Sequence, residues 1–122
     1  MSGRRDESLL LDDVVHATSR LIELGSNEVT QLGDDLPSDE RVLYNLIILG
    51  EAVKRLSPET RERFADVPWS PMARARDRVV HHYEGMDWPV IESIIRSDLP
   101  PMLPRLLEIR DILREEYDSE RA

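Results

Sequence analysis

The most apolar stretch of this 122-residue chain is Val42-Leu-Tyr-Asn-Leu-Ile-Ile-Leu-Gly-Glu-Ala-Val-Lys-Arg-Leu56. Apolar residues recur in it at positions 42, 46, 49, 53 and 56, the spacing that one face of an α-helix requires. The pattern predicts a central core helix that starts at a cap on Ser38 or Asp39 and runs to about Leu56. Gly50 lies inside this helix, where it costs about 1 kcal/mol relative to alanine. Close approach of another helix or of a ligand would explain it.

The same stretch carries two charged residues, Glu51 and Lys54, on or near its polar side. Solvated charge is the favoured interpretation of both. Before the stretch, a first helix to about Glu23 is predicted by apolar residues at spacings of four and three, namely Leu10, Val14, Ala17, Leu21 and Leu24. His16 lies beside this stripe and is expected at the surface. Residues 25–37 read as a loop, with irregular helix around residues 29–32 as one option.

After the stretch, Ser57-Pro58 is a helix start signal and predicts a short helix through about Phe64. Residues 66–71 should form an extended connector in which Trp69 is a packing anchor rather than a platform for stacking a base. Ser70-Pro71 begins another helix that stops near Gly85. A further helix starts at residues 87–89 and breaks at residues 97–101. The last helix is predicted to start near Pro100 or Pro101, because Pro104 is tolerated only in a first turn, and to end near residue 117.

These elements predict an all-α fold, an up-and-down bundle of four to five helices in one domain over residues 1–122, with a core of about 9–113. The chain has no cysteine, which excludes disulfides and thiol nucleophiles, and its three histidines lack the spacing of a metal site. We therefore expect neither metal nor cofactor. No apolar run reaches the roughly 20 residues of a membrane span, so a cytoplasmic protein without membrane contact is predicted.

Reactive side chains concentrate in one stretch, residues 69–83, which ends in Val-Val-His81-His82-Tyr83 and contains Arg74, Arg76 and Arg78. The net charge of −9 argues against a general nucleic-acid binder, but this local group of arginines suits one or two phosphates. Arg76 and Tyr83 are seven residues apart and share a helix face, whereas His81 lies about 140° from Arg76 in a regular helix. His81 therefore belongs to another face, or the last turn loosens and lets the groups converge.

The sequence Arg76-Asp-Arg-Val-Val-His81-His-Tyr83 fits the Arg-x4-His-x-Tyr pattern of the HEPN superfamily. The chain resembles its HepT-like branch, the toxin partners of minimal nucleotidyltransferases. Three further segments occur in the family's order: Leu49 to Leu56, Val67-Pro-Trp69 and Asp98-Leu-Pro100. The motif alone is weak, but the ordered set is specific and covers most of the chain.

The resemblance implies a HEPN-like helical homodimer that brings two motifs together at a cleft and cleaves RNA without a metal ion. It implies the toxin of a type VII toxin–antitoxin system, whose cognate nucleotidyltransferase antitoxin attaches AMP to Tyr83. Arg76 would bind the phosphate, since a guanidinium offers a fork of donors to the oxygens where charge grows, and His81 would be the acid–base group. Possible supporting residues are Asp77, Arg78 and His82, the last of which is expected at the surface.

One departure from the family pattern is Asp77, where many relatives have an amide. An ionised carboxylate cannot donate a hydrogen bond as an amide does, and it can pair with Arg76 or Arg78 and repel RNA. The alternative function is therefore a non-catalytic helical partner that binds and regulates a nucleotidyltransferase. A third hypothesis is that Arg76, His81 and Tyr83 only cap and pack the end of a helix.

Overall fold

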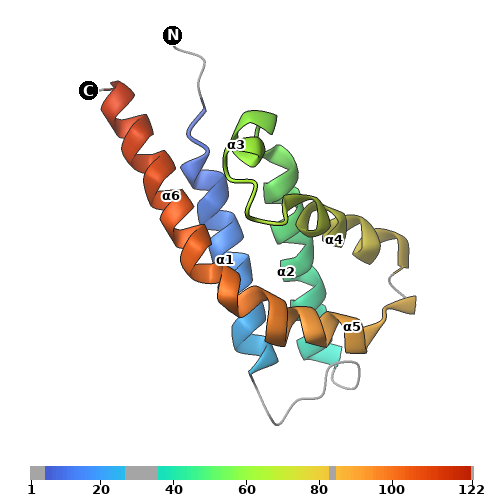
Figure 1. Cartoon of the computed structure of the whole chain (residues 1–122). Coiled ribbons are helices and arrows are strands. Elements are labelled where there is room, and N and C mark those ends of the chain that lie inside the picture. Colours follow the sequence, from blue (N-terminus) through green and yellow to red (C-terminus); the bar gives the residue numbers. More distant parts are fainter. Residues whose placement is uncertain (1–4, 27–35, 83–84, 122) are drawn as a thin grey trace.

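The computed structural model describes residues 5–26, 36–82 and 85–121. Its elements in chain order are α1 (Ser8–Gly25), α2 (Leu36–Arg55), α3 (Pro58–Arg63), α4 (Trp69–His82), α5 (Trp88–Ser93), the π-helix η2 (Ile94–Asp98) and α6 (Leu99–Arg121). No strand occurs within these ranges, so the predicted all-α fold is confirmed. The helix α1 runs antiparallel to both α2 and α6, and α4 crosses α2 (Figure 1).

The hydrophobic core forms where α1 packs against both α2 and α6, and where α2 packs against α4. The predicted stripe of α1 faces this core: Leu10, Val14, Ala17 and Leu21 are buried. The five stripe positions from Val42 to Leu56 are buried as well, four of them on α2 and Leu56 directly after its end. The two stripes were identified from spacing alone, and both packing faces are confirmed.

Two predicted helix starts differ in outcome. Ser57 caps α3, since its side chain accepts a hydrogen bond from the Thr60 backbone N–H at 3.1 Å, as the Ser-Pro signal predicts. The start of α2 was predicted too late, because the helix begins at Leu36 and includes Ser38 and Asp39 instead of using either as a cap. The suggested irregular helix at residues 29–32 lies outside the described residues.

The predicted break at residues 97–101 is wrong, because the chain continues through it as helix. Residues Ile94–Asp98 form a π-helix, in which the Leu99 backbone N–H donates to the Ile94 carbonyl five residues earlier. Pro100 and Pro101, which have no N–H to donate, lie in the first turn of α6, directly after this wide turn. The helix α6 then extends to Arg121, four residues beyond the predicted end.

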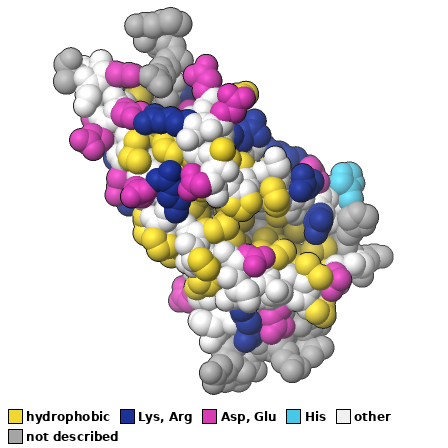
Figure 2. All heavy atoms as spheres, viewed as in Figure 1, with side chains coloured by type: hydrophobic (Ala, Val, Ile, Leu, Met, Phe, Trp, Pro, Cys, Tyr) yellow, Lys and Arg dark blue, Asp and Glu magenta, His cyan; other side chains and the backbone are white. Residues whose placement is uncertain are grey.

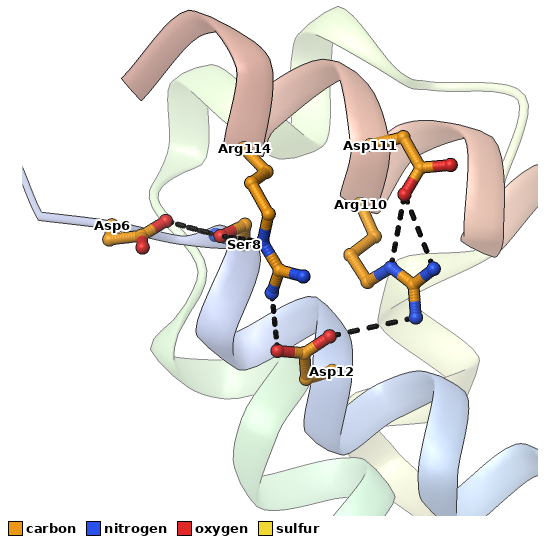
Figure 3. Close-up of polar contacts among 6 residues, drawn as sticks. All are labelled: Asp6, Ser8, Asp12, Arg110, Asp111 and Arg114. Carbon is orange, nitrogen blue, oxygen red and sulfur yellow. Dashed lines mark hydrogen bonds and ion pairs between the residues drawn. The ribbon is translucent and has the colours of Figure 1, made fainter. Parts of the chain in front are cut away.

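Ion pairs fasten α6 to α1 near the end of the bundle where the two termini lie (Figures 1 and 3). Arg114 Nη2 lies 2.5 Å from Asp12 Oδ2, and Arg110 Nη1 lies 3.6 Å from Asp12 Oδ1. Asp12 thus forms ion pairs with two arginines one helical turn apart. These groups are partly exposed, so the pairs orient the helices more than they stabilise them. In the described part of the chain, no helix combines the length and the apolar character that crossing a membrane requires.

Candidate functional site

The helix α4, which carries the motif, is anchored at its first residue. Trp69 is 4% exposed, and its indole N–H donates to the Phe64 backbone carbonyl at 2.9 Å. The predicted role of Trp69 as a packing anchor is therefore confirmed. The helix begins at Trp69 itself, one residue before the predicted Ser70, and Pro71 occupies its first turn.

At Gly50 of α2 the helix α4 approaches closely, beside the motif arginine. A Cβ atom built on Gly50 would lie 2.5 Å from Arg76 Cβ and 2.9 Å from the Arg76 backbone nitrogen. Such distances are far below van der Waals contact, so no larger residue fits without movement of a helix. The glycine is thus explained by a neighbouring helix, one of the two options that the sequence left open.

Gly50→Ala is expected to destabilise the fold by about 1–3 kcal/mol, because the added methyl group pushes against the α4 backbone. This loss exceeds the gain of about 1 kcal/mol that alanine brings to a helix interior. Urea denaturation of the two proteins measures the difference. Gly85→Ala is the matched control, since a Cβ there meets nothing within 4 Å and should change stability by less than about 0.5 kcal/mol. A Gly50→Ala protein as stable as the wild type would contradict this packing.

The close approach at Gly50 brings Glu51 of α2 against the motif arginine. Arg76 Nε lies 2.6 Å from Glu51 Oε1, and Arg76 Nη1 lies 3.3 Å from Asp77 Oδ1. The Arg76 side chain remains 36% exposed. The guanidinium is therefore held in place through its Nε edge, while it can still be reached from solvent.

Asp77 is shared between two cations. Lys54 Nζ lies 2.6 Å from the same oxygen, Asp77 Oδ1, that Arg76 contacts. The hydrogen bond from Lys54 lowers the pKa of Asp77 below its ordinary value, and the bond from Arg76 adds to this effect against the opposing influence of desolvation. Asp77 is thus an anion at neutral pH. Its pairing with Arg76 was anticipated, whereas Lys54 as its closest partner was not.

His81 is exposed and follows Arg76 by five residues on α4. The helix α4 stays α-helical through His82, so the option of a loosened last turn does not apply as far as that residue. In a regular helix the two side chains leave the axis about 140° apart. His82 ends α4, and Tyr83 lies outside the described residues, so the convergence of Arg76, His81 and Tyr83 on one pocket stays a prediction.

Arg78 points to a different part of the surface. It lines a groove of about 540 Å³ between α2, α4 and the α5–η2–α6 segment. The wall is mainly apolar, with Asp87 and Asp98 as its acidic members. Figure 2 shows hydrophobic side chains around a hollow at this place, with Lys and Arg side chains near it. Because its wall is apolar, the groove is unsuited to a phosphate, and Arg78 is separated from the Arg76 cluster.

Glu51 and Lys54 are the site residues that sequence reasoning missed, because both were interpreted as solvated charge. A signal was present: they follow Gly50 on α2 and are three residues apart, hence on one face. A glycine that admits a second helix places its charged neighbours beside that helix. Within residues 5–26, 36–82 and 85–121, no group of three His, Cys, Asp or Glu side chains could hold a metal ion.

Comparison with known proteins identifies the family of the chain. The family model described as Ribonuclease HepT-like matches residues 12–109. A Methanocaldococcus jannaschii protein named "Putative RNase" is 30% identical over 119 residues, 95% of this chain and 98% of that protein. "Probable ribonuclease HepT" of Thermococcus cleftensis is 28% identical over 88% of this chain and 98% of its own.

A third relative, named "Putative RNase", comes from Caldanaerobacter subterraneus subsp. tengcongensis and is 38% identical over 65 residues, 53% of this chain and 58% of that protein. No solved structure matches the chain significantly. The family model covers most of the chain, including α2, α4 and the Arg76 to His81 segment. The chain therefore belongs to the Ribonuclease HepT-like family.

Proposed function

We propose that this chain is an RNA endonuclease that needs no metal ion, with Arg76 as the phosphate-binding residue and His81 as the acid–base residue. The observation that carries the proposal is the state of Arg76: Glu51 orients its guanidinium at 2.6 Å, and the side chain stays accessible to solvent. Membership of the family and the names of three relatives support the same activity.

The proposed reaction uses the ribose of RNA as its own nucleophile. The 2′-oxygen attacks the adjacent phosphorus, its proton goes to a base, and the bond from phosphorus to the 5′-oxygen breaks. The products are a 2′,3′-cyclic phosphate and a 5′-hydroxyl, whose oxygen receives a proton. An imidazole can take or supply such a proton near neutral pH, and a guanidinium stabilises the charge on the phosphate oxygens.

A second copy of the chain would complete the site. Within one chain Arg76 and His81 leave α4 in different directions, so we propose a homodimer in which the arginine of one copy and the histidine of the other face one phosphate. Val80 supports this arrangement: it lies four residues from Arg76, on the same face of α4, and is 51% exposed. An exposed valine beside the site is suited to contact with another copy.

The toxin–antitoxin part of the proposal rests on the family resemblance. In it, the chain is the toxin, a nucleotidyltransferase is the cognate antitoxin, and AMP attached to Tyr83 blocks RNA by adding bulk and phosphate charge. The alternative, a non-catalytic partner that regulates a nucleotidyltransferase, is favoured by the pairing of Arg76 with two carboxylates, since these reduce its positive potential toward RNA.

Purified wild-type protein is expected to cleave single-stranded RNA in EDTA, because the proposed chemistry uses only side chains. DNA of the same sequence should remain intact, since it lacks the 2′-hydroxyl. Gel analysis of labelled oligonucleotides, with mass spectrometry of the fragment ends, measures both. Protein free of AMP that leaves RNA intact would refute the nuclease and favour the regulatory alternative.

A further inference from the structure

The cluster at the α2–α4 crossing contains a second cation that the proposed reaction does not use. Lys54 Nζ and Arg76 Nη1 both contact Asp77 Oδ1, at 2.6 and 3.3 Å. Two positively charged groups from different helices therefore converge on one oxygen atom of an anion. Charge-assisted hydrogen bonds of this kind are also the bonds that a phosphate oxygen accepts from lysine and arginine.

The geometry of this convergence is built into the packing of the helices. Gly50 lets α2 and α4 approach, and Lys54 follows it by one helical turn on α2. Glu51, three residues before Lys54 on the same face, holds Arg76 through Nε at 2.6 Å. If the Asp77 side chain rotates away, Glu51 still keeps the guanidinium beside Lys54. The guanidinium is thus positioned independently of Asp77, and Lys54 lies one helical turn after Gly50 on the neighbouring helix.

The Asp77 carboxylate is an exchangeable occupant of this position. The side chains of Lys54, Arg76 and Asp77 are 36–40% exposed, and ion pairs in such surroundings contribute little stability. An anion from solution can therefore take the place of the carboxylate at small cost.

We propose that Lys54 is a second phosphate-binding residue, and that Lys54 and Arg76 form a two-cation clamp for one phosphate of single-stranded RNA, at the position where the Asp77 carboxylate now lies. This inference rests on the proposed function, which supplies RNA as the ligand. It adds Lys54 to the site as a binding residue and the Asp77 carboxylate as a competing anion. Asp77 then weakens RNA binding by occupying the clamp, and the departure from an amide at this position lowers affinity.

Binding of a 2′-O-methyl oligoribonucleotide, which cannot be cleaved through its 2′-oxygen, tests the clamp by fluorescence anisotropy. Lys54→Met should weaken binding about 5- to 10-fold and reduce the slope of log affinity against log salt by about 0.7, the value for one lost contact with a single strand. Asp77→Asn should tighten binding by a similar factor, since it removes the competing charge. Inorganic phosphate should compete only at far higher concentration, because it makes none of the other contacts of the strand.

Arg55→Met is the matched control. Arg55 is the exposed neighbour of Lys54 on α2 and carries the same charge, so its loss should change affinity less than 2-fold if non-specific attraction is all that it supplies. A Lys54→Met protein that binds RNA as the Arg55→Met protein does would overturn the clamp. An Asp77→Asn protein with unchanged or weaker affinity would also overturn it.

The double variant Asp77→Asn/Lys54→Met distinguishes two roles of Lys54, contact with the RNA phosphate and neutralisation of the Asp77 charge. If Lys54 only neutralises Asp77, then Lys54→Met should have no effect once Asp77 is asparagine, and that result would contradict the clamp. If Lys54 contacts phosphate, Lys54→Met should still weaken binding about 5-fold or more in the Asp77→Asn protein.

The clamp and the nuclease can fail separately, because the binding probe cannot be cleaved. If the wild type binds the probe through Lys54 and yet leaves natural RNA intact, only the nuclease is refuted. A wild type that cleaves RNA with Lys54→Met unchanged would refute the clamp alone.

Discussion

Arg76→Ala is expected to reduce the rate of RNA cleavage at least about 100-fold, the effect typical of removing one donor that stabilises developing oxyanion charge. The guanidinium, fixed by Glu51 at 2.6 Å, is already oriented before RNA arrives, so its loss cannot be replaced by solvent. Steady-state cleavage of a labelled oligonucleotide in EDTA measures the effect as kcat/KM. Thermal unfolding should change little, because the ion pairs of Arg76 are partly exposed.

Arg74→Ala is the control for this variant. Arg74 lies on α4 two residues before Arg76, is exposed, and carries the same charge, so its loss tests general attraction of RNA. We expect a less than 3-fold change, since one exposed charge contributes weakly. Arg76→Lys should recover only part of the activity, because an ammonium lacks the planar fork. Equal activity of the Arg74→Ala and Arg76→Ala proteins would remove Arg76 from the reaction.

His81→Ala is expected to reduce cleavage about 100-fold or more while the affinity for uncleavable RNA stays within about 2-fold, since general acid–base catalysis contributes at this level without contributing to binding. His81 is exposed on α4, so its replacement should leave the fold intact. The separation of the two readouts distinguishes a proton-transfer role from a structural one. Single-turnover cleavage and anisotropy binding are the two measurements.

Two other histidines serve as controls. His16 is exposed on α1, and His16→Ala should leave cleavage unchanged. His82→Ala tests the neighbour that the motif spacing excludes, and we expect at most a few-fold loss. Full activity of His81→Ala together with an inactive His82→Ala would transfer the acid–base role to His82 and refute the spacing argument.

The fold was largely predictable because its helices bury regular stripes. On α1, Leu10, Val14 and Leu21 follow the spacing of a packed helix face, and each is buried. Trp69 was predictable for a related reason, since a large side chain at a helix junction gains most from burial. Such features depend on local periodicity or on side-chain size, which are visible in the sequence.

The π-helix and the start of α2 were not predictable in the same way. Pro100 and Pro101 read as a break because proline removes backbone donors, and only the packed η2–α6 segment shows that a wide turn keeps the helix continuous. Ser38 and Asp39 were predicted as caps because serine and aspartate favour the N-cap position, yet the helix begins earlier, at Leu36. In both places the helix extends through residues whose types favour a helix boundary.

The candidate site was predictable in its motif and not in its surroundings. Asp77 was expected to be able to pair with Arg76 or Arg78, and it pairs with Arg76. Glu51 and Lys54 were missed because a charge on a polar helix face is normally solvated, and the sequence does not show which helix crosses at Gly50. For His81, the sequence left open whether it lies on another face of the helix than Arg76 or on a loosened last turn. The helix α4 is regular through His82, which favours different faces within one chain.

Mixing the two inactive variants tests the central proposal, an arginine and a histidine from two copies that act on one phosphate. The Arg76→Ala and His81→Ala proteins are unfolded together in denaturant and refolded, so that copies redistribute. If each site combines residues of both copies, a mixed dimer keeps one intact site, and about one quarter of wild-type cleavage should return. If activity stays at the level of either variant alone, while the mixture forms dimers, then the two residues do not meet across a dimer and the account is contradicted.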